Sequence, residues 1–72
     1  MKMKEYMFLG FRKIKGVNID QFYNKFKEDV FDVFSEELSK LIKIGLIEIN
    51  DNYIKLTNRG LDLANLVFEE FC

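Results

Sequence analysis

The chain has 72 residues, of which 49% are hydrophobic and 15% aromatic, with four glycines and no proline. A chain of this length makes one small domain, because folding hides only about 60% of the surface of so short a chain. Eleven basic residues against twelve acidic ones give a net charge of −1. This balance argues against nucleic acid as a partner, since phosphate binding depends on a basic surplus. We expect a single domain over residues 1–72.

The sequence gives no sign of a membrane or secreted protein. No apolar run approaches the roughly 20 residues that span a bilayer, and residues 1–5 lack the apolar stretch of a signal peptide. The single cysteine, Cys72, cannot form an internal disulfide and has no basic neighbour that would favour its thiolate. These features indicate a cytoplasmic protein.

The spacing of apolar residues predicts a first helix from Met3 to about Ile14. Its buried face repeats at helical spacing through Met3, Met7, Phe11 and Ile14. Gly10 lies in the middle, where glycine costs about 1 kcal/mol relative to alanine. Either a neighbouring backbone passes close to it, or the glycine is a tolerated neutral change. Basic residues such as Arg12 favour the C-terminal end of the helix, and Gly16 ends it.

Two further helices are predicted before the middle of the chain. Asn18 is the expected N-cap of the second helix, with Gln21 completing a capping box. Its core-facing stripe is Ile19, Phe22, Tyr23 and Phe26, and a polar turn at residues 27–29 follows. The third helix is expected from about Val30 to Ile44. Its buried face holds Phe31, Phe34, Leu38, Leu41 and Ile42.

A hairpin and a last helix complete the pattern. Gly45 closes the third helix in the left-handed conformation, and strands at residues 46–49 and 53–56 flank a turn at residues 50–52. Thr57 is the expected cap of a helix from about Asn58 to Phe71. One face of that helix is lined by Leu61, Ala64, Asn65 and Phe68. We predict a mainly α domain with a small β-hairpin (α+β): winged-helix-like, with three helices, a two-stranded wing and a C-terminal helix.

The residues offer little chemistry. There is no histidine, and the four glycines are dispersed rather than gathered in a phosphate-binding loop. Two pairs of adjacent glutamates point about 100° apart on their helices, so they are not the facing carboxylates of an acid–base pair. No cluster of Cys, Asp and Glu has metal-ligand spacing. We therefore predict no catalytic, cofactor-binding or metal-binding residue, and no enzyme activity for this chain in isolation.

A winged helix suggests DNA binding, but the charges argue against it. Residues 29–43 carry four acidic and two basic side chains, a net charge of −2, and the hairpin tip adds Asp51. Phosphates would repel a recognition helix and wing of this sign. Two alternatives stay open: a free-standing winged-helix DNA-binding regulator, and a small protein-interaction module whose apolar helix faces bind a partner or a second copy.

Several stretches, read together, are more specific than the fold. They are EYMFLGFR at residues 5–12 followed by Gly16-Val17, then Gly45-Leu46-Ile47, Leu56-Thr57-Asn58-Arg59-Gly60, and LANLVFEEF at residues 63–71. In this order they resemble the C-terminal domain of the oxygen-independent coproporphyrinogen III oxidase family, radical SAM proteins that include haem chaperones. The resemblance runs from about Lys4 to Phe71. Phe11 replaces a leucine of the family pattern, and Lys27 follows Phe26 where the family often has glycine.

The resemblance implies a part of a larger protein of porphyrin and haem metabolism. The family's catalytic barrel has a C-x-x-x-C-x-x-C motif that holds a [4Fe–4S] cluster and S-adenosylmethionine, and this sequence has no counterpart to it. The family's C-terminal domain packs beside the barrel and helps cover the site of a tetrapyrrole. The resemblance thus implies a non-catalytic accessory domain without a cofactor of its own, whose partner is the barrel of an oxidase or a haem chaperone.

The matching residues are expected to be structural: Glu5, Gly10, Arg12, Gly45, Thr57, Gly60 and Asn65. Gly10 would permit close packing of the first helix. Arg12 would anchor an ion pair, with Glu5 two turns away as a candidate partner, or bind backbone carbonyls. Thr57 would cap the last helix, and Asn65 would fix a loop through its side chain.

Overall fold

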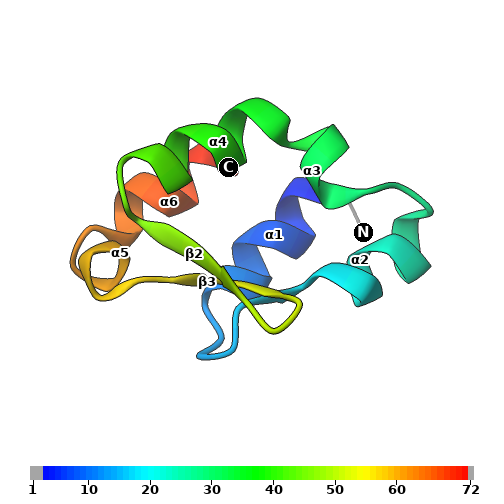
Figure 1. The fold of residues 1–72 in the computed structure, drawn as a ribbon, viewed down its shortest axis with the longest axis horizontal. Coiled ribbons are helices and arrows are strands. Elements are labelled where there is room, and N and C mark those ends of the chain that lie inside the picture. The colour runs from blue at the N-terminus through cyan, green and yellow to red at the C-terminus, as the bar shows by residue number, and fades with distance from the viewer. Residues whose placement is uncertain (1–2, 72) are drawn as a thin grey trace.

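The computed structural model describes residues 3–71, which form helices around a small sheet (Figure 1). The elements in chain order are α1 (Met3–Phe11), β1 (Val17–Asn18), α2 (Ile19–Phe26), α3 (Val30–Val33), α4 (Ser35–Lys43), β2 (Ile47–Asn50), β3 (Tyr53–Leu56), α5 (Asn58–Asp62) and α6 (Ala64–Glu70). Figure 1 shows α1 in the middle of the view, α4 along the top, and the α1–β1 loop and hairpin tip at the bottom. This order and composition confirm the predicted α+β, winged-helix-like class.

The hairpin forms where the sequence predicts it. β2 and β3 pair antiparallel with Ile47 opposite Leu56 and Ile49 opposite Ile54. The turn residues Asp51 and Asn52 have φ of 50° and 67°. Both lie in the left-handed region that a two-residue hairpin turn requires and that Asp and Asn tolerate.

A third strand was not foreseen, and it shortens the first helix. β1 pairs antiparallel with β3, with Val17 opposite Ile54, so the sheet order is β1–β3–β2. To reach this pairing the chain leaves α1 after Phe11 and turns through Gly16, whose φ is 86°. The predicted helix end at Ile14 and the burial of that side chain are therefore wrong, since Ile14 is 98% exposed.

The two long helices predicted for residues 30–44 and 58–71 are each broken once. The breaks fall at Phe34 and Leu63, which share φ of −116° with ψ of 36° and 33°. The Phe34 ring is buried between the rings of Phe22, at 6.2 Å, and Phe71, at 5.2 Å between centroids. Packing this aromatic ring in the core fixes the break, because the turn there lets α3 and α4 both face the core.

The core gathers apolar side chains from all layers of the domain. The buried residues are Met7, Phe11, Val17, Phe22, Val30, Phe34, Leu38, Leu41, Leu46, Ile47, Ile54, Val67 and Phe71. Besides Ile14, three apolar or aromatic residues predicted on buried faces are exposed: Tyr23 at 53%, Ile42 at 42% and Leu61 at 63%. They lie at the edges of apolar arcs that are wider than the core surface available to a domain of this size.

Candidate functional site

Three of the predicted motif residues meet at the base of the hairpin. The Thr57 hydroxyl donates to the Gly45 carbonyl at 2.6 Å and accepts from the Gly60 N–H at 3.0 Å. The Thr57 N–H donates to the Leu46 carbonyl at 3.0 Å. Gly60 is buried, and a Cβ there would overlap the carbonyl oxygen of Leu46. Gly45, Thr57 and Gly60 thus join α4, the hairpin and α5, which is a structural task.

Gly10 marks a close approach between α1 and the sheet. A Cβ built at Gly10 would lie 2.6 Å from Cγ2 of Val17, a buried side chain of β1. Real Cβ atoms essentially never approach another atom so closely, so an alanine here would force Val17 or α1 to move. The neighbour closest to that Cβ is a side chain and not the backbone that the sequence suggested, since the Cα of Val17 lies 3.5 Å from it.

Arg12 lies in the loop just after α1 and is exposed. Its guanidinium carbon lies 5.5 Å from the centroid of the Phe8 ring, and Phe8 packs on Phe68 of α6 with ring centroids 5.1 Å apart. Within residues 3–71 the structure contains no ion pair or hydrogen bond from the side chain of Arg12 or of the exposed Glu5. Arg12 therefore stacks on an aromatic ring, and the pairing with Glu5 considered from the sequence is absent.

Among residues 3–71, no loop is held by the side chain of Asn65. Asn65 is exposed on α6, and its side chain makes no hydrogen bond to another residue in the described part of the chain. The sequence placed it on an apolar face, but the break at Leu63 turns that face, so that Val67 and Phe71 carry the burial. The single cysteine of the sequence, Cys72, lies outside the described residues.

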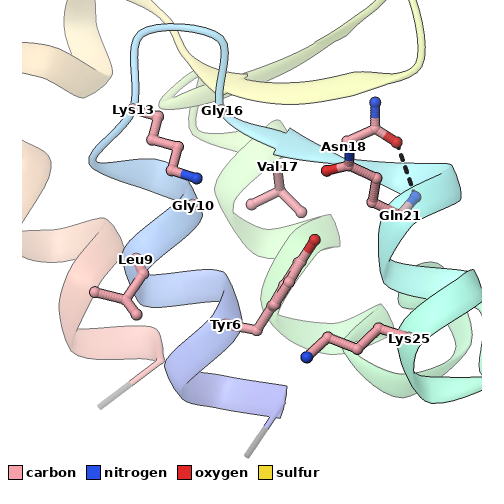
Figure 2. A pocket seen from close by; sticks show the side chains of 9 residues that line it. All are labelled: Tyr6, Leu9, Gly10, Lys13, Gly16, Val17, Asn18, Gln21 and Lys25. Carbon is pink, nitrogen blue, oxygen red and sulfur yellow. Dashed lines mark hydrogen bonds between the residues drawn. The ribbon is translucent and has the colours of Figure 1, made fainter. Parts of the chain in front are cut away.

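A groove runs between α1 and the β1–α2 segment (Figure 2). We call it the α1–α2 groove, and it encloses about 190 Å³. Its lining residues are Tyr6, Leu9, Gly10, Lys13, Gly16, Val17, Asn18, Gln21 and Lys25. Figure 2 shows the Lys13 side chain running from the loop toward Gly10, and the Lys25 side chain running from α2 toward Tyr6. Sequence reasoning missed this groove, because the residues of the EYMFLGFR and Gly16-Val17 motif that line it meet Lys13 and the residues of α2 only in the folded chain.

The lining of the α1–α2 groove is cationic. It includes two lysines and no carboxylate. The ion pair that the structure records within residues 3–71 joins Lys40 to Glu70 at 3.0 Å, and both of these lie outside the groove. Neither Lys13 nor Lys25 has a carboxylate oxygen within 4.0 Å among those residues. The groove is thus locally positive on a chain whose net charge is −1.

A second hollow lies beside the outer face of the sheet. It has a volume of about 320 Å³, and its lining residues are Phe11, Arg12, Lys13, Ile14, Glu48, Lys55, Leu56, Asn58 and Leu61. We call this the outer hollow. Ile14, at 98% exposure, and Leu61, at 63%, are its most exposed apolar residues. The sequence placed both on buried helical faces, so this surface was also missed.

The described residues do not fit a metal or iron–sulfur group. Across residues 3–71 no three His, Cys, Asp or Glu side chains come together in a way that holds a metal ion. In the same range, no helix has the length and apolar character needed to cross a lipid bilayer. The described residues form a packing junction around Thr57, the cationic α1–α2 groove and the outer hollow with its exposed apolar residues.

The order of helices and strands, with a hairpin between α4 and α5, defines a small winged-helix-like domain. Comparison with known proteins identifies its family: the chain belongs to the HemN C-terminal domain family, whose model matches residues 2–63. The resemblance found in the sequence is therefore confirmed. The tail at residues 64–71, which also contributed to that resemblance, lies beyond the part that the family model matches.

Two curated relatives are heme chaperones. The chain is 39% identical over 70 residues to the heme chaperone HemW of Lactococcus lactis subsp. lactis (strain IL1403). It is 36% identical over 70 residues to the heme chaperone HemW of Bacillus subtilis (strain 168). Each alignment covers 97% of this chain but 18% of the relative, so the chain spans under a fifth of the relatives' length. No solved structure matches significantly.

Proposed function

We propose that this chain is the non-catalytic C-terminal domain of a radical SAM protein of the coproporphyrinogen oxidase and haem chaperone type. In that protein it packs on the catalytic barrel and helps cover the site of a tetrapyrrole. The observation that carries the proposal is the family match over residues 2–63, together with relatives of which the chain spans 18%. The names of these relatives favour a haem chaperone over an oxidase as the parent.

The same proposal places the reactive groups outside this chain. The [4Fe–4S] cluster and S-adenosylmethionine would be bound by the barrel through its cysteine motif, and the parent would work in the cytoplasm. The described residues of this chain supply contacts and cover rather than ligands, and no step of the reaction is assigned to them.

The outer hollow is the surface we expect the barrel to contact. Ile14 and Leu61 are exposed at 98% and 63% and line one hollow together with Phe11 and Leu56. Apolar side chains gathered at one exposed site are typical of a surface that a partner covers. The charged lining residues are Arg12, Lys13 and Lys55 against Glu48, a net charge of +2. The facing surface of the barrel would then be apolar at its centre and acidic at its rim.

A binding experiment between the two parts of the protein tests this proposal. The chain and the separately produced N-terminal region of the same protein, or of the Bacillus subtilis relative, are mixed and their affinity measured by calorimetry. We expect a one-to-one complex, weakened about tenfold by Ile14→Ser or Leu61→Ser, because truncating a central apolar anchor costs 1–2 kcal/mol or more. Tyr23→Ser is the matched control, since Tyr23 is 53% exposed but does not line the outer hollow.

The outcomes separate the proposal from its alternatives. No complex between two folded parts would overturn the docking function. A complex weakened equally by all three substitutions would keep docking but remove the outer hollow as its site. Sedimentation of the chain alone, run as a control, would show self-association if this were an independent dimerisation module.

A further inference from the structure

We propose that the α1–α2 groove is a binding site for a carboxylate carried on a short aliphatic stem. The groove lies between α1 and α2 and is distinct from the outer hollow, although Lys13 lines both. A carboxylate site here does not depend on the docking function proposed above. It would add a ligand to a domain to which only packing has been assigned.

Most polar groups around the groove can donate hydrogen bonds, and the side-chain amide of Gln21 can both donate and accept. Lys13 and Lys25 contribute ammonium groups without a carboxylate partner in the described structure. Asn18 accepts the Gln21 N–H through its side-chain oxygen at 2.8 Å, so its amide nitrogen is left to donate. Tyr6 adds a hydroxyl on a ring that is held in place by edge-on packing against Phe22, at 5.8 Å, and Phe26, at 5.4 Å. Such a set of donors complements a ligand that only accepts hydrogen bonds, as a carboxylate does.

The walls of the groove are apolar between these donors. Leu9, Gly10 and Val17 line it together with the Tyr6 ring. The volume of about 190 Å³ far exceeds the roughly 10–15 Å³ that one water molecule needs. An apolar stem can therefore contact the walls while its charged end meets one of the two lysines, which Figure 2 shows at different ends of the groove. Small-ligand sites commonly combine apolar walls with a few well-placed polar groups in this way.

The backbone argues against a phosphate site. Phosphate is typically bound by successive free backbone N–H groups at a helix N-terminus or in a nest. At the start of α2 two of these N–H groups are already used: Ile19 donates to the Asn52 carbonyl at 2.9 Å and Gln21 to the Asn18 side chain. The donors that remain are side chains at the edge of an apolar wall. This arrangement favours a carboxylate with a stem over a bare oxyanion.

Titration of this chain by NMR tests the site, with sodium butyrate as the probe. We expect saturable shifts of the Gly10, Gly16 and Val17 amides, which line the groove. Acetate should bind more weakly because it lacks the stem, and n-butylammonium should not bind because its charge is reversed. Phosphate and sodium chloride at the same ionic strength should give smaller shifts. Removing the lysine that meets the carboxylate, by Lys13→Gln or Lys25→Gln, should weaken butyrate binding about threefold to tenfold, the range between surface and buried charge pairs.

Lys15→Gln is the matched control. It removes the same charge from the same loop, but Lys15 does not line the groove. The proposal is overturned if butyrate produces no saturable shifts, if chloride reproduces them, or if Lys15→Gln weakens binding as much as the more sensitive of Lys13→Gln and Lys25→Gln. A peptide with a central glutamate, blocked at both ends, identifies the source of the carboxylate. Tighter binding of the peptide than of butyrate indicates a protein side chain, and tighter binding of butyrate a small free acid.

Discussion

The hydroxyl of Thr57 links the two ends of the hairpin by donating to the Gly45 carbonyl at 2.6 Å while accepting from the Gly60 N–H at 3.0 Å. Gly45 follows the end of α4, and Gly60 lies in the first turn of α5. One side chain therefore satisfies a carbonyl beyond one helix and an orphan N–H of the next. This contact fixes how the helices on either side of the hairpin are connected.

Replacing Thr57 by valine should destabilise the domain by about 1–3 kcal/mol, because it removes an N-cap and leaves a partly buried carbonyl without its donor. Thr57→Ser keeps the hydroxyl and should lose less than about 1 kcal/mol. Urea unfolding followed by circular dichroism measures both. A valine variant as stable as the wild-type chain would show that the junction is held by packing and not by the hydroxyl.

The two glycines at this junction should differ sharply in their tolerance of alanine. At Gly60 a Cβ would overlap a backbone oxygen, that of Leu46, which cannot move without shifting the strand. We expect Gly60→Ala to lose several-fold more stability than Gly45→Ala. The cost at Gly45 is only that of its left-handed φ of 79°, about 1–2 kcal/mol, because its nearest neighbour is the Cδ of Arg59 at 3.9 Å. Thermal unfolding of both variants gives the order, and equal losses would contradict it.

The features predictable from the sequence are local ones. Asn18 caps α2 by accepting from the Gln21 N–H, and Thr57 caps α5. Gly45 ends α4 with its N–H bonded to the Ile42 carbonyl, while the Leu46 N–H bonds to the Leu41 carbonyl; together these form a Schellman motif. Each depends on residues within a few positions of one another, so a side chain's own preference decides the outcome.

The features that escaped prediction depend on contacts distant in sequence. The β1 strand has two residues, which is too short for any periodicity, and it exists because Val17 pairs with Ile54. The break at Phe34 reflects its contact with Phe71. Because α3 and α4 face the same core, the helical spacing of apolar residues continues across the break. The sequence therefore predicted one helix where the structure has two.

The candidate sites were predicted only in part. The sequence motif singled out Gly10 and Arg12 of the first predicted helix as structural residues. The proximity of Gly10 to Val17 gives a physical reason for a glycine at position 10. The α1–α2 groove needs Lys13 from a loop and Lys25 from α2 in one place. Only the folded chain brings them together, since the flanking sequence of neither lysine distinguishes it from other surface lysines.

The domain should fail to bind duplex DNA despite its winged-helix order. The α3–α4 region and its cap carry Asp29, Asp32, Glu36 and Glu37 against Lys40 and Lys43, and all six are exposed or half-exposed. We expect no saturable change in the anisotropy of a fluorescent duplex at low salt, where phosphate contacts are strongest. Binding that weakens steeply with added salt would revive the interpretation as a DNA-binding regulator.

The contact between Gly10 and Val17 predicts a coupling that a double-mutant cycle can measure. Gly10→Ala gains up to about 1 kcal/mol of helix propensity. It also places a methyl group 2.6 Å from Cγ2 of the buried Val17, and such overpacking typically costs 1–3 kcal/mol. We therefore expect Gly10→Ala to destabilise the wild-type background. Val17→Ala should destabilise it as well, by opening a cavity.

In the double variant the alanine methyl at position 10 occupies space that the valine has vacated. Its stability loss should then be smaller than the sum of the single losses by about 1 kcal/mol or more, the coupling expected for residues in contact. Urea unfolding of the two single variants, the double variant and the wild-type chain completes the cycle. Losses that add within about 0.3–0.5 kcal/mol would mean that α1 shifts freely away from β1. Gly10 would then be the neutral change that the sequence alone left open.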